Sequence, residues 1–149
     1  MSIVQSLLSN YILKVTVIAW RTAQILKTLI NTIFTKKFSA ERLVGAGGMP
    51  SAHSAFVCSL VVATGNQCGF SSAEFAIAFA LAVVVMYDAM GVRRAAGEQA
   101  KIINLMVDEM TKYIPSNNLP VEDLKEFLGH TPIEVIAGAI LGISIALLL

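Results

Sequence analysis

The chain has 149 residues, a length that suits a single domain covering residues 1–149. Hydrophobic residues make up 56% of it and charged residues only 14%, whereas soluble domains are about 25% charged, so the composition argues against a soluble fold and for lipid as solvent. The formal net charge of +1 excludes the basic surface of a nucleic-acid-binding protein.

The first apolar stretch, within residues 7–34, is polar for a membrane span. Its polar interruptions fall on or near one helical face. They are Lys14, Arg21, Gln24, Lys27 and Asn31. One interpretation is a helix lying partly in the interface with snorkelling lysines. The interpretation that we favour is a span whose polar stripe faces a pocket, because charged side chains in membrane helices usually face a bundle interior or a cavity.

Three further apolar stretches follow, at about residues 50–64, 73–92 and 132–149. A spanning helix needs ~20 apolar residues, with a range of ~17–25. The last two stretches meet this length, and the short one suits a helix that begins inside protein. The sequence therefore predicts an all-α integral membrane bundle with about four transmembrane helices.

The polar region between the third and fourth stretches predicts a short cytoplasmic helical segment. The string RRAAGEQAKIINLMVDEMTKYI has helical periodicity, and VEDLKEFLGH resembles a short amphipathic helix closed by Gly129.

Lysine and arginine positions predict the orientation. The loop at residues 65–72 carries neither residue type. The other two connections carry Lys36, Lys37, Arg42, Arg93, Arg94, Lys101, Lys112 and Lys125. The positive-inside rule places both basic connections in the cytoplasm and both termini outside. We expect the protein in a bacterial cytoplasmic membrane.

This orientation brings the two histidines of the chain to the same membrane face. His53 begins the second stretch and His130 begins the fourth, each on a cytoplasmic side. The end of the third stretch, YDAMGVRR, reaches that face with Asp88, Arg93 and Arg94. The topology thus predicts that the titratable groups converge.

The string GGMPSAHSA at residues 47–55 predicts a turn into a helix with Ser51 as N-cap. Free N–H groups at a helix N-terminus bind phosphate, and Ser51 and His53 would add to them. The alternative is an ordinary capped helix with an interfacial histidine.

In GHTPIEVIAGAILG, His130 and Glu134 are four residues apart and share a helical face. A carboxylate on one ring nitrogen fixes the tautomer and raises the basicity of the other nitrogen, as a nucleophilic histidine requires. The alternative is a pair that only caps the helix. Gly138 and Gly142 form a GxxxG pair that permits close helix packing, within the chain or between copies in a homo-oligomer.

Arg93 and Arg94 are either membrane anchors or bidentate clamps for phosphate oxygens. Asp88, one turn inside an apolar helix, needs a cationic partner, and these arginines are nearest in sequence. The sequence has no HExxH, CxxC, Walker or GxSxG motif. We therefore expect no metal and no cofactor.

The strings Pro50-Ser51-Ala52-His53 and His130 to Glu134 resemble the PSGH and HxxxD motifs of the type 2 phosphatidic acid phosphatase superfamily. The longer strings GGMPSAHSA, YDAMGVRRAAGEQA and LGHTPIEVIAGA resemble its divergent membrane branch, which is related to acid phosphatases and vanadium-dependent haloperoxidases.

The resemblance implies that His130 is the nucleophile, Glu134 its orienting group, His53 the general acid and Ser51 a phosphate ligand. The motif arginine falls on Leu124, so Arg93 or Arg94 would replace it. For the missing first motif Lys27 is our preference, and Arg42 is also a candidate.

Together these features predict a metal-independent phosphatase acting on a lipid phosphate or lipid pyrophosphate, with membrane lipids as its surroundings. A non-enzymatic transporter or scaffold with a vestigial phosphate site is the alternative. A vanadate-dependent peroxidase is disfavoured by the short, membrane-embedded chain.

Overall fold

The computed structural model describes residues 2–36, 48–113, 124 and 129–149. In these ranges the chain is helical, without a strand, which confirms the all-α class. The helices are α1 (Ile3–Ser9), α2 (Tyr11–Thr35), α3 (Ala52–Cys68), α4 (Ala73–Met90), α5 (Val92–Tyr113) and α6 (Pro132–Leu148). The region predicted as helical at residues 93–114 is α5. The second helix predicted in that region lies almost entirely outside the described residues.

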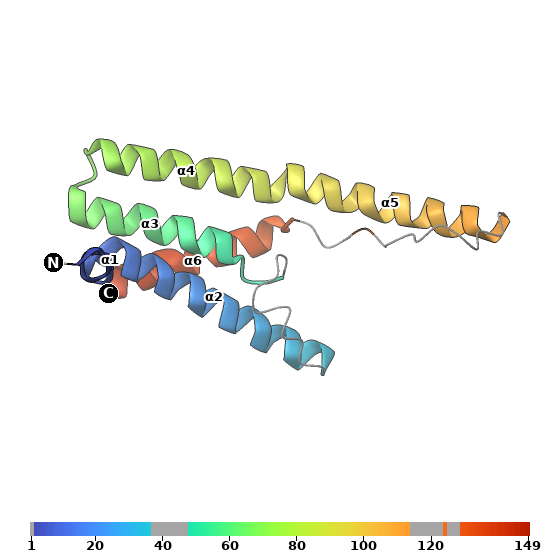
Figure 1. Cartoon of the computed structure of the whole chain (residues 1–149), viewed down its shortest axis with the longest axis horizontal. Helices are drawn as coiled ribbons and strands as arrows, with labels where there is room; N and C mark the ends of the chain where they lie inside the picture. Colours follow the sequence, from blue (N-terminus) through green and yellow to red (C-terminus); the bar gives the residue numbers. More distant parts are fainter. Residues whose placement is uncertain (1, 37–47, 114–123, 125–128) are drawn as a thin grey trace.

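Helix α3 is the centre of the bundle, and α2, α4 and α6 each pack against it. Among the described residues α2 and α4 make no contact with one another, so they flank α3 on different sides. Figure 1 shows α5 continuing the line of α4 far beyond the bundle, and α1 lying across the end of α2 near both termini. The bend between α1 and α2 is 67°.

Small side chains form the inside of the bundle. Apart from Pro50, the buried apolar side chains among the described residues are alanine, valine or cysteine. Helix α6 approaches α3 so closely that a Cβ atom at Gly138 would overlap the carbonyl oxygen of Ser51, and one at Gly142 would overlap that of Ala55. The predicted GxxxG packing is therefore made within the chain. Association of copies stays a prediction.

Large apolar side chains point outward instead. Ile77 and Val84 on α4 are 69% and 65% exposed, and Ile140 and Leu147 on α6 are 61% and 69% exposed. A soluble protein rarely exposes such a continuous apolar surface. Small residues between helices and large ones outside are the arrangement expected when lipid surrounds the bundle.

The predicted count of four transmembrane helices is not confirmed. In the described part of the chain one continuous helical run, residues 73–111, is long and apolar enough to cross a membrane. The bent pair of α1 and α2 gives a second span if it crosses as one unit. Helices α3 and α6 have only 17 residues each, the lower end of the spanning range.

The predicted polar stripe on α2 is only partly buried. Gln24 and Lys27 are buried, with 7% and 3% of their surfaces exposed, while Lys14 and Arg21 are exposed. The buried face instead follows residues spaced by four, such as Val15, Ala19 and Ala23. The buried face is the one that packs against α3. The polar stripe therefore faces the interior only in the C-terminal half of α2.

Candidate active site

The N-terminal end of α6 holds Glu134 in a fixed position. Thr131 is the N-cap, its side chain accepts from the Glu134 N–H at 3.4 Å, and Glu134 Oε2 accepts from the Thr131 N–H at 3.0 Å. The same carboxylate oxygen lies 3.1 Å from Nδ1 of His130. Because a carboxylate only accepts, Nδ1 carries the proton and Nε2 keeps its lone pair. Glu134 therefore caps the helix and also orients the imidazole.

His130 is fixed by its backbone as well as by its ring. Only 3% of its surface is exposed, and its N–H donates to the carbonyl oxygen of Ala89 at 3.0 Å, which ties α6 to the end of α4. Gly129 before it has a φ of 89° and lies against the backbone of Arg94, where a Cβ would overlap. Glycine is therefore required at this turn.

The pKa of His130 lies below its ordinary value of 6.5. Burial is the main cause, and the charges of Lys27 and Arg93 add to it, while the hydrogen bond and charge of Glu134 act in the opposite direction. His130 is thus neutral at neutral pH, the form in which an imidazole is a nucleophile.

Ser51 joins α3 to α6. Its N–H donates to the Glu134 carbonyl oxygen at 3.0 Å, and its Oγ accepts from the N–H and the hydroxyl of Ser54. The side chain is completely buried. These bonds confirm the predicted N-cap role of Ser51, and its role as a phosphate ligand stays a prediction.

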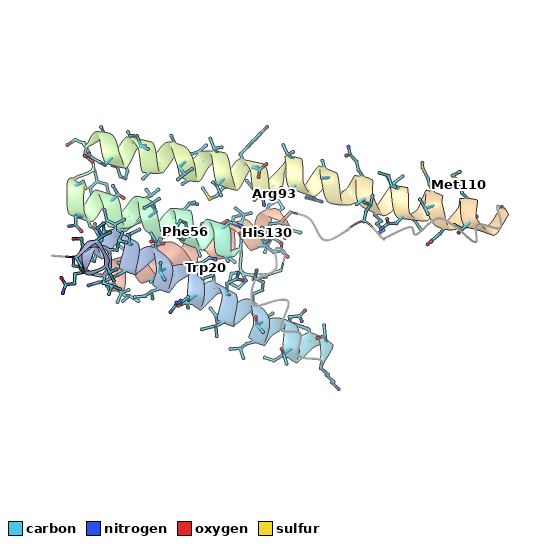
Figure 2. The ribbon with its side chains drawn as sticks, viewed as in Figure 1. Trp20, Phe56, Arg93, Met110 and His130 are labelled. Atoms are coloured by element: carbon cyan, nitrogen blue, oxygen red, sulfur yellow. The ribbon has the colours of Figure 1, made fainter. Side chains whose placement is uncertain are left out.

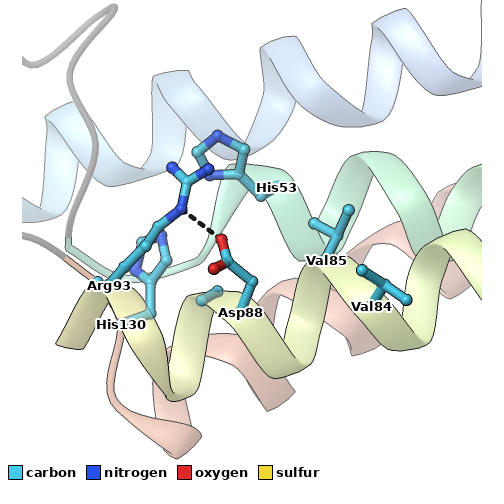
Figure 3. Close-up of a pocket in the computed structure, with 8 residues that line it drawn as sticks. His53, Val84, Val85, Asp88, Arg93 and His130 are labelled. Carbon is cyan, nitrogen blue, oxygen red and sulfur yellow. Dashed lines mark hydrogen bonds and ion pairs between the residues drawn. The ribbon is translucent and has the colours of Figure 1, made fainter. Parts of the chain in front are cut away.

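The two histidines open onto one cavity of about 150 Å³ between α3, α4 and the start of α6. The ring centroids of His53 and His130 are 6.1 Å apart, and the ring planes are inclined by 61°. Figure 3 shows both rings with Arg93 and Asp88 around the cavity. A group as small as a phosphoryl could contact both rings at this spacing.

Arg93 and Asp88 form an ion pair at the cavity wall. Arg93 Nε lies 2.6 Å from Asp88 Oδ2, and the side chains are 54% and 39% exposed. The expected partnership of Asp88 with a nearby arginine is thus present. Arg94 is exposed and does not line the cavity, so the structure distinguishes the two arginines that the sequence left equivalent.

The other predicted cations lie elsewhere. Lys27 is buried on α2, close enough for its charge to lower the pKa of His130, but it does not line the cavity. Arg42 lies outside the described residues. Leu124, at the position of the motif arginine, pairs through its backbone with the Asn104 side chain on α5.

Comparison with known proteins identifies the family. A model described as the Divergent PAP2 family, named for type 2 phosphatidic acid phosphatase, matches residues 8–145. The chain belongs to the divergent PAP2 family. It is 38% identical over 151 residues to the Bacillus subtilis (strain 168) protein named "Uncharacterized membrane protein YuiD", and the match covers 96% of each chain. No solved structure matches significantly. The family, this relative and the outward apolar surface together make the chain a membrane protein.

Some contributions to the site of this divergent PAP2 protein were missed from the sequence. The cap Thr131 carries a recognisable signal, because Thr-x-x-Glu is a capping box. No sequence signal identifies the carbonyl of Ala89, or Val84 and Val85 in the cavity wall, as parts of the site. No group of three or more histidine, cysteine or acidic side chains suited to a metal occurs within the described ranges. The expected metal independence stays a prediction.

Proposed function

We propose that the chain is an integral membrane phosphatase that hydrolyses a lipid phosphate or lipid pyrophosphate through a phosphohistidine, without a metal. The observation that carries this proposal is the shared cavity of His53 and His130, with Glu134 bonded to the buried ring. Neutral His130 oriented by a carboxylate is a nucleophile–orienter pair, and His53 lies across the cavity as a proton donor.

In the first step, Nε2 of His130 attacks phosphorus and the bond from phosphorus to the leaving oxygen breaks. His53 gives its proton to that oxygen, and Glu134 stabilises the positive charge on the phosphorylated imidazole. In the second step, water attacks phosphorus, the N–P bond breaks, and His53 accepts the proton of the water. Phosphate leaves, and both histidines return to their starting states.

Arg93 supplies the positive charge that the transition state needs. Its guanidinium can bind two phosphoryl oxygens at once, and the ion pair with Asp88 holds it at the wall of the cavity. A bound phosphate would compete with Asp88 for these donors. We place this site at headgroup depth on the cytoplasmic face, where a lipid substrate can leave its chains in the bilayer.

Phosphate release in detergent tests the proposal. Purified protein should release phosphate from a panel of phosphatidate, phosphatidylglycerophosphate and polyprenyl pyrophosphate with EDTA present. His130→Ala should remove that activity, and Glu74→Gln, at the exposed start of α4, should keep it. Equal release by His130→Ala would refute the assigned role.

A non-enzymatic transporter or scaffold is the second candidate. It is favoured by Leu124, which stands where the superfamily motif has arginine and pairs with α5 instead of lining the cavity. This candidate predicts that phosphate or vanadate binds with no turnover of any lipid in the panel.

A further inference from the structure

An apolar groove adjoins the cavity of the histidines. It has a volume of about 350 Å³ and is lined by one residue of α2, three of α3 and two of α4. These residues are Trp20, His53, Phe56, Val57, Leu81 and Val85. Apart from His53, every lining side chain is apolar or aromatic, so the groove offers nothing to bind a second phosphate.

The groove and the cavity share two residues, His53 and Val85. His53 is exposed at this junction. The cavity and the groove together therefore have a polar end at the two histidines. The apolar part begins at the ring of His53, the proposed proton donor. This polarity matches a molecule with a phosphate at one end and hydrocarbon at the other.

The groove runs along α3 and α4, away from the phosphate end. Along α4 it passes from Val85 to Leu81, one turn or ~6 Å along the axis, and along α3 from His53 to Val57. Its mouth is open to the surroundings, since Trp20 and Leu81 are 38% and 45% exposed. The groove lies over α3, between α2 and α4, which make no contact with each other among the described residues. Figure 2 labels Trp20 and Phe56 in this region.

We propose that this groove holds one hydrocarbon chain of the substrate lipid, which enters from the bilayer between α2 and α4. The inference rests on the proposed phosphatase function for its headgroup end. The chain contacts Trp20, Phe56 and Leu81, and its placement directs the phosphate to His53 and His130. A soluble phosphate ester of the same headgroup lacks these contacts and is a poor substrate.

Trp20 is the only tryptophan in the chain, so its fluorescence reports on the groove without any substitution. Wild-type protein is placed in phosphatidylcholine vesicles with a small fraction of a phosphonate analogue of phosphatidate, which the protein cannot hydrolyse and whose chains carry bromine, a quencher. The same fraction of brominated diacylglycerol is the control. We expect several-fold stronger quenching by the phosphonate, relieved by the non-brominated phosphonate. Equal quenching by the two lipids would overturn the proposal.

A substitution that fills the groove gives the second test of the proposal. Leu81→Trp narrows the groove, and Ile77→Trp makes the same change one turn away at a site that is 69% exposed and outside the groove. Leu81→Trp should lower kcat/KM for a long-chain lipid phosphate about tenfold or more and leave a short-chain soluble ester unaffected, while Ile77→Trp changes neither. An equal loss for both substrates, or no loss, contradicts the groove.

The two tests separate this inference from the function on which it rests. Specific quenching without phosphate release refutes the phosphatase and retains the groove. Phosphate release with unspecific quenching retains the phosphatase and refutes the groove.

Discussion

At the scale of single residues, Glu134 joins helix capping to the orientation of the histidine. One carboxylate oxygen accepts from the Thr131 N–H and from the His130 ring. Since the capping box fixes the carboxylate, the imidazole can turn only by losing its hydrogen bond to Glu134. This is a more rigid arrangement than a surface His–Glu pair.

The lowered pKa of His130 sets the pH at which activity falls in acid, the acid limb of the pH profile. Because burial lowers this pKa below 6.5, the neutral nucleophile persists when a free histidine would already be protonated. We expect kcat/KM to fall with acid only at a pH below 6.5, since this parameter reports the free enzyme. The native state also binds fewer protons than the unfolded chain there, so the free energy of unfolding falls as pH drops below about 6.5. A fall of kcat/KM that already begins above pH 6.5 would contradict the assignment of His130 as the nucleophile.

Glu134→Gln tests the orienting role. Glutamine preserves the capping box but removes the negative charge that raises the pKa of His130. We therefore expect the acid limb to move to lower pH and kcat to fall at least ~100-fold, as when a buried histidine loses its carboxylate partner. Glu74→Gln, the same change at the far end of α4, is the matched control. A fall in Tm without a shift of the limb would show a purely structural role.

Arg93 and Arg94 form a natural matched pair. Arg93 lines the cavity, whereas Arg94 does not. Arg93→Ala should lower kcat/KM about 10- to 100-fold, because a charged hydrogen bond contributes ~1.5–3 kcal/mol. Arg93→Lys should restore only part of the loss, since lysine cannot bind two oxygens in a fork. Equal losses in Arg93→Ala and Arg94→Ala would mean that net charge alone matters.

At the scale of helices, local signals located most elements correctly. The third predicted stretch, 73–92, corresponds to α4 because Ser72 caps its start and Gly91 follows its end. The bend at Asn10 and the straight continuation of α4 into α5 were not predicted. At the bend, the Asn10 side chain caps α2 by accepting from the Leu13 N–H.

The same limit applies to the candidate site. Its histidines and Glu134 could be found because their sequence spacing carries the chemistry. The cavity side of Arg93 depends on contacts between distant segments, so the sequence left Arg93 and Arg94 equivalent. The N-cap role of Ser51 was predicted, because its bond to the Ser54 N–H is local.

The close contact between α6 and α3 predicts that a larger residue at Gly142 destabilises the bundle. Gly142→Ala places a methyl group against the Ala55 carbonyl oxygen, so α6 must shift, at a cost of about 1–3 kcal/mol. Thermal unfolding in detergent should show Tm lower by several degrees. Ser144→Thr adds a methyl at an exposed position of the same helix and should leave Tm nearly unchanged. Identical midpoints for both variants would mean that the helices are less closely packed.

At the scale of the whole molecule, the bundle has two distinct ends. Both termini and the α3–α4 turn lie at one end, while the start of α3, the end of α4 and the start of α6 lie at the other (Figure 1). The candidate site is therefore at the end that carries Arg93 and Arg94. Positive charge at this end predicts that it faces the cytoplasm.

Native cysteines allow that orientation to be measured. Cys68, at the end opposite the site, is exposed, and Cys58 is buried. A membrane-impermeant maleimide should label Cys68 in right-side-out vesicles and not in sealed inside-out vesicles. Gln99→Cys on exposed α5, in a Cys68→Ser background, should give the reverse pattern. If Cys68 is labelled only in inside-out vesicles, the site faces outside.

The most direct test of the central claim is capture of the covalent intermediate. Wild-type protein is mixed with phosphatidate labelled in the phosphate, quenched in alkali within the first turnover, and digested for mass spectrometry. Alkali is used because a phosphoramidate survives it and is lost in acid. The account predicts one labelled peptide, with the phosphoryl group on His130, and no label in His130→Ala. Label on another residue, or phosphate release at an undiminished rate from His130→Ala, would contradict it.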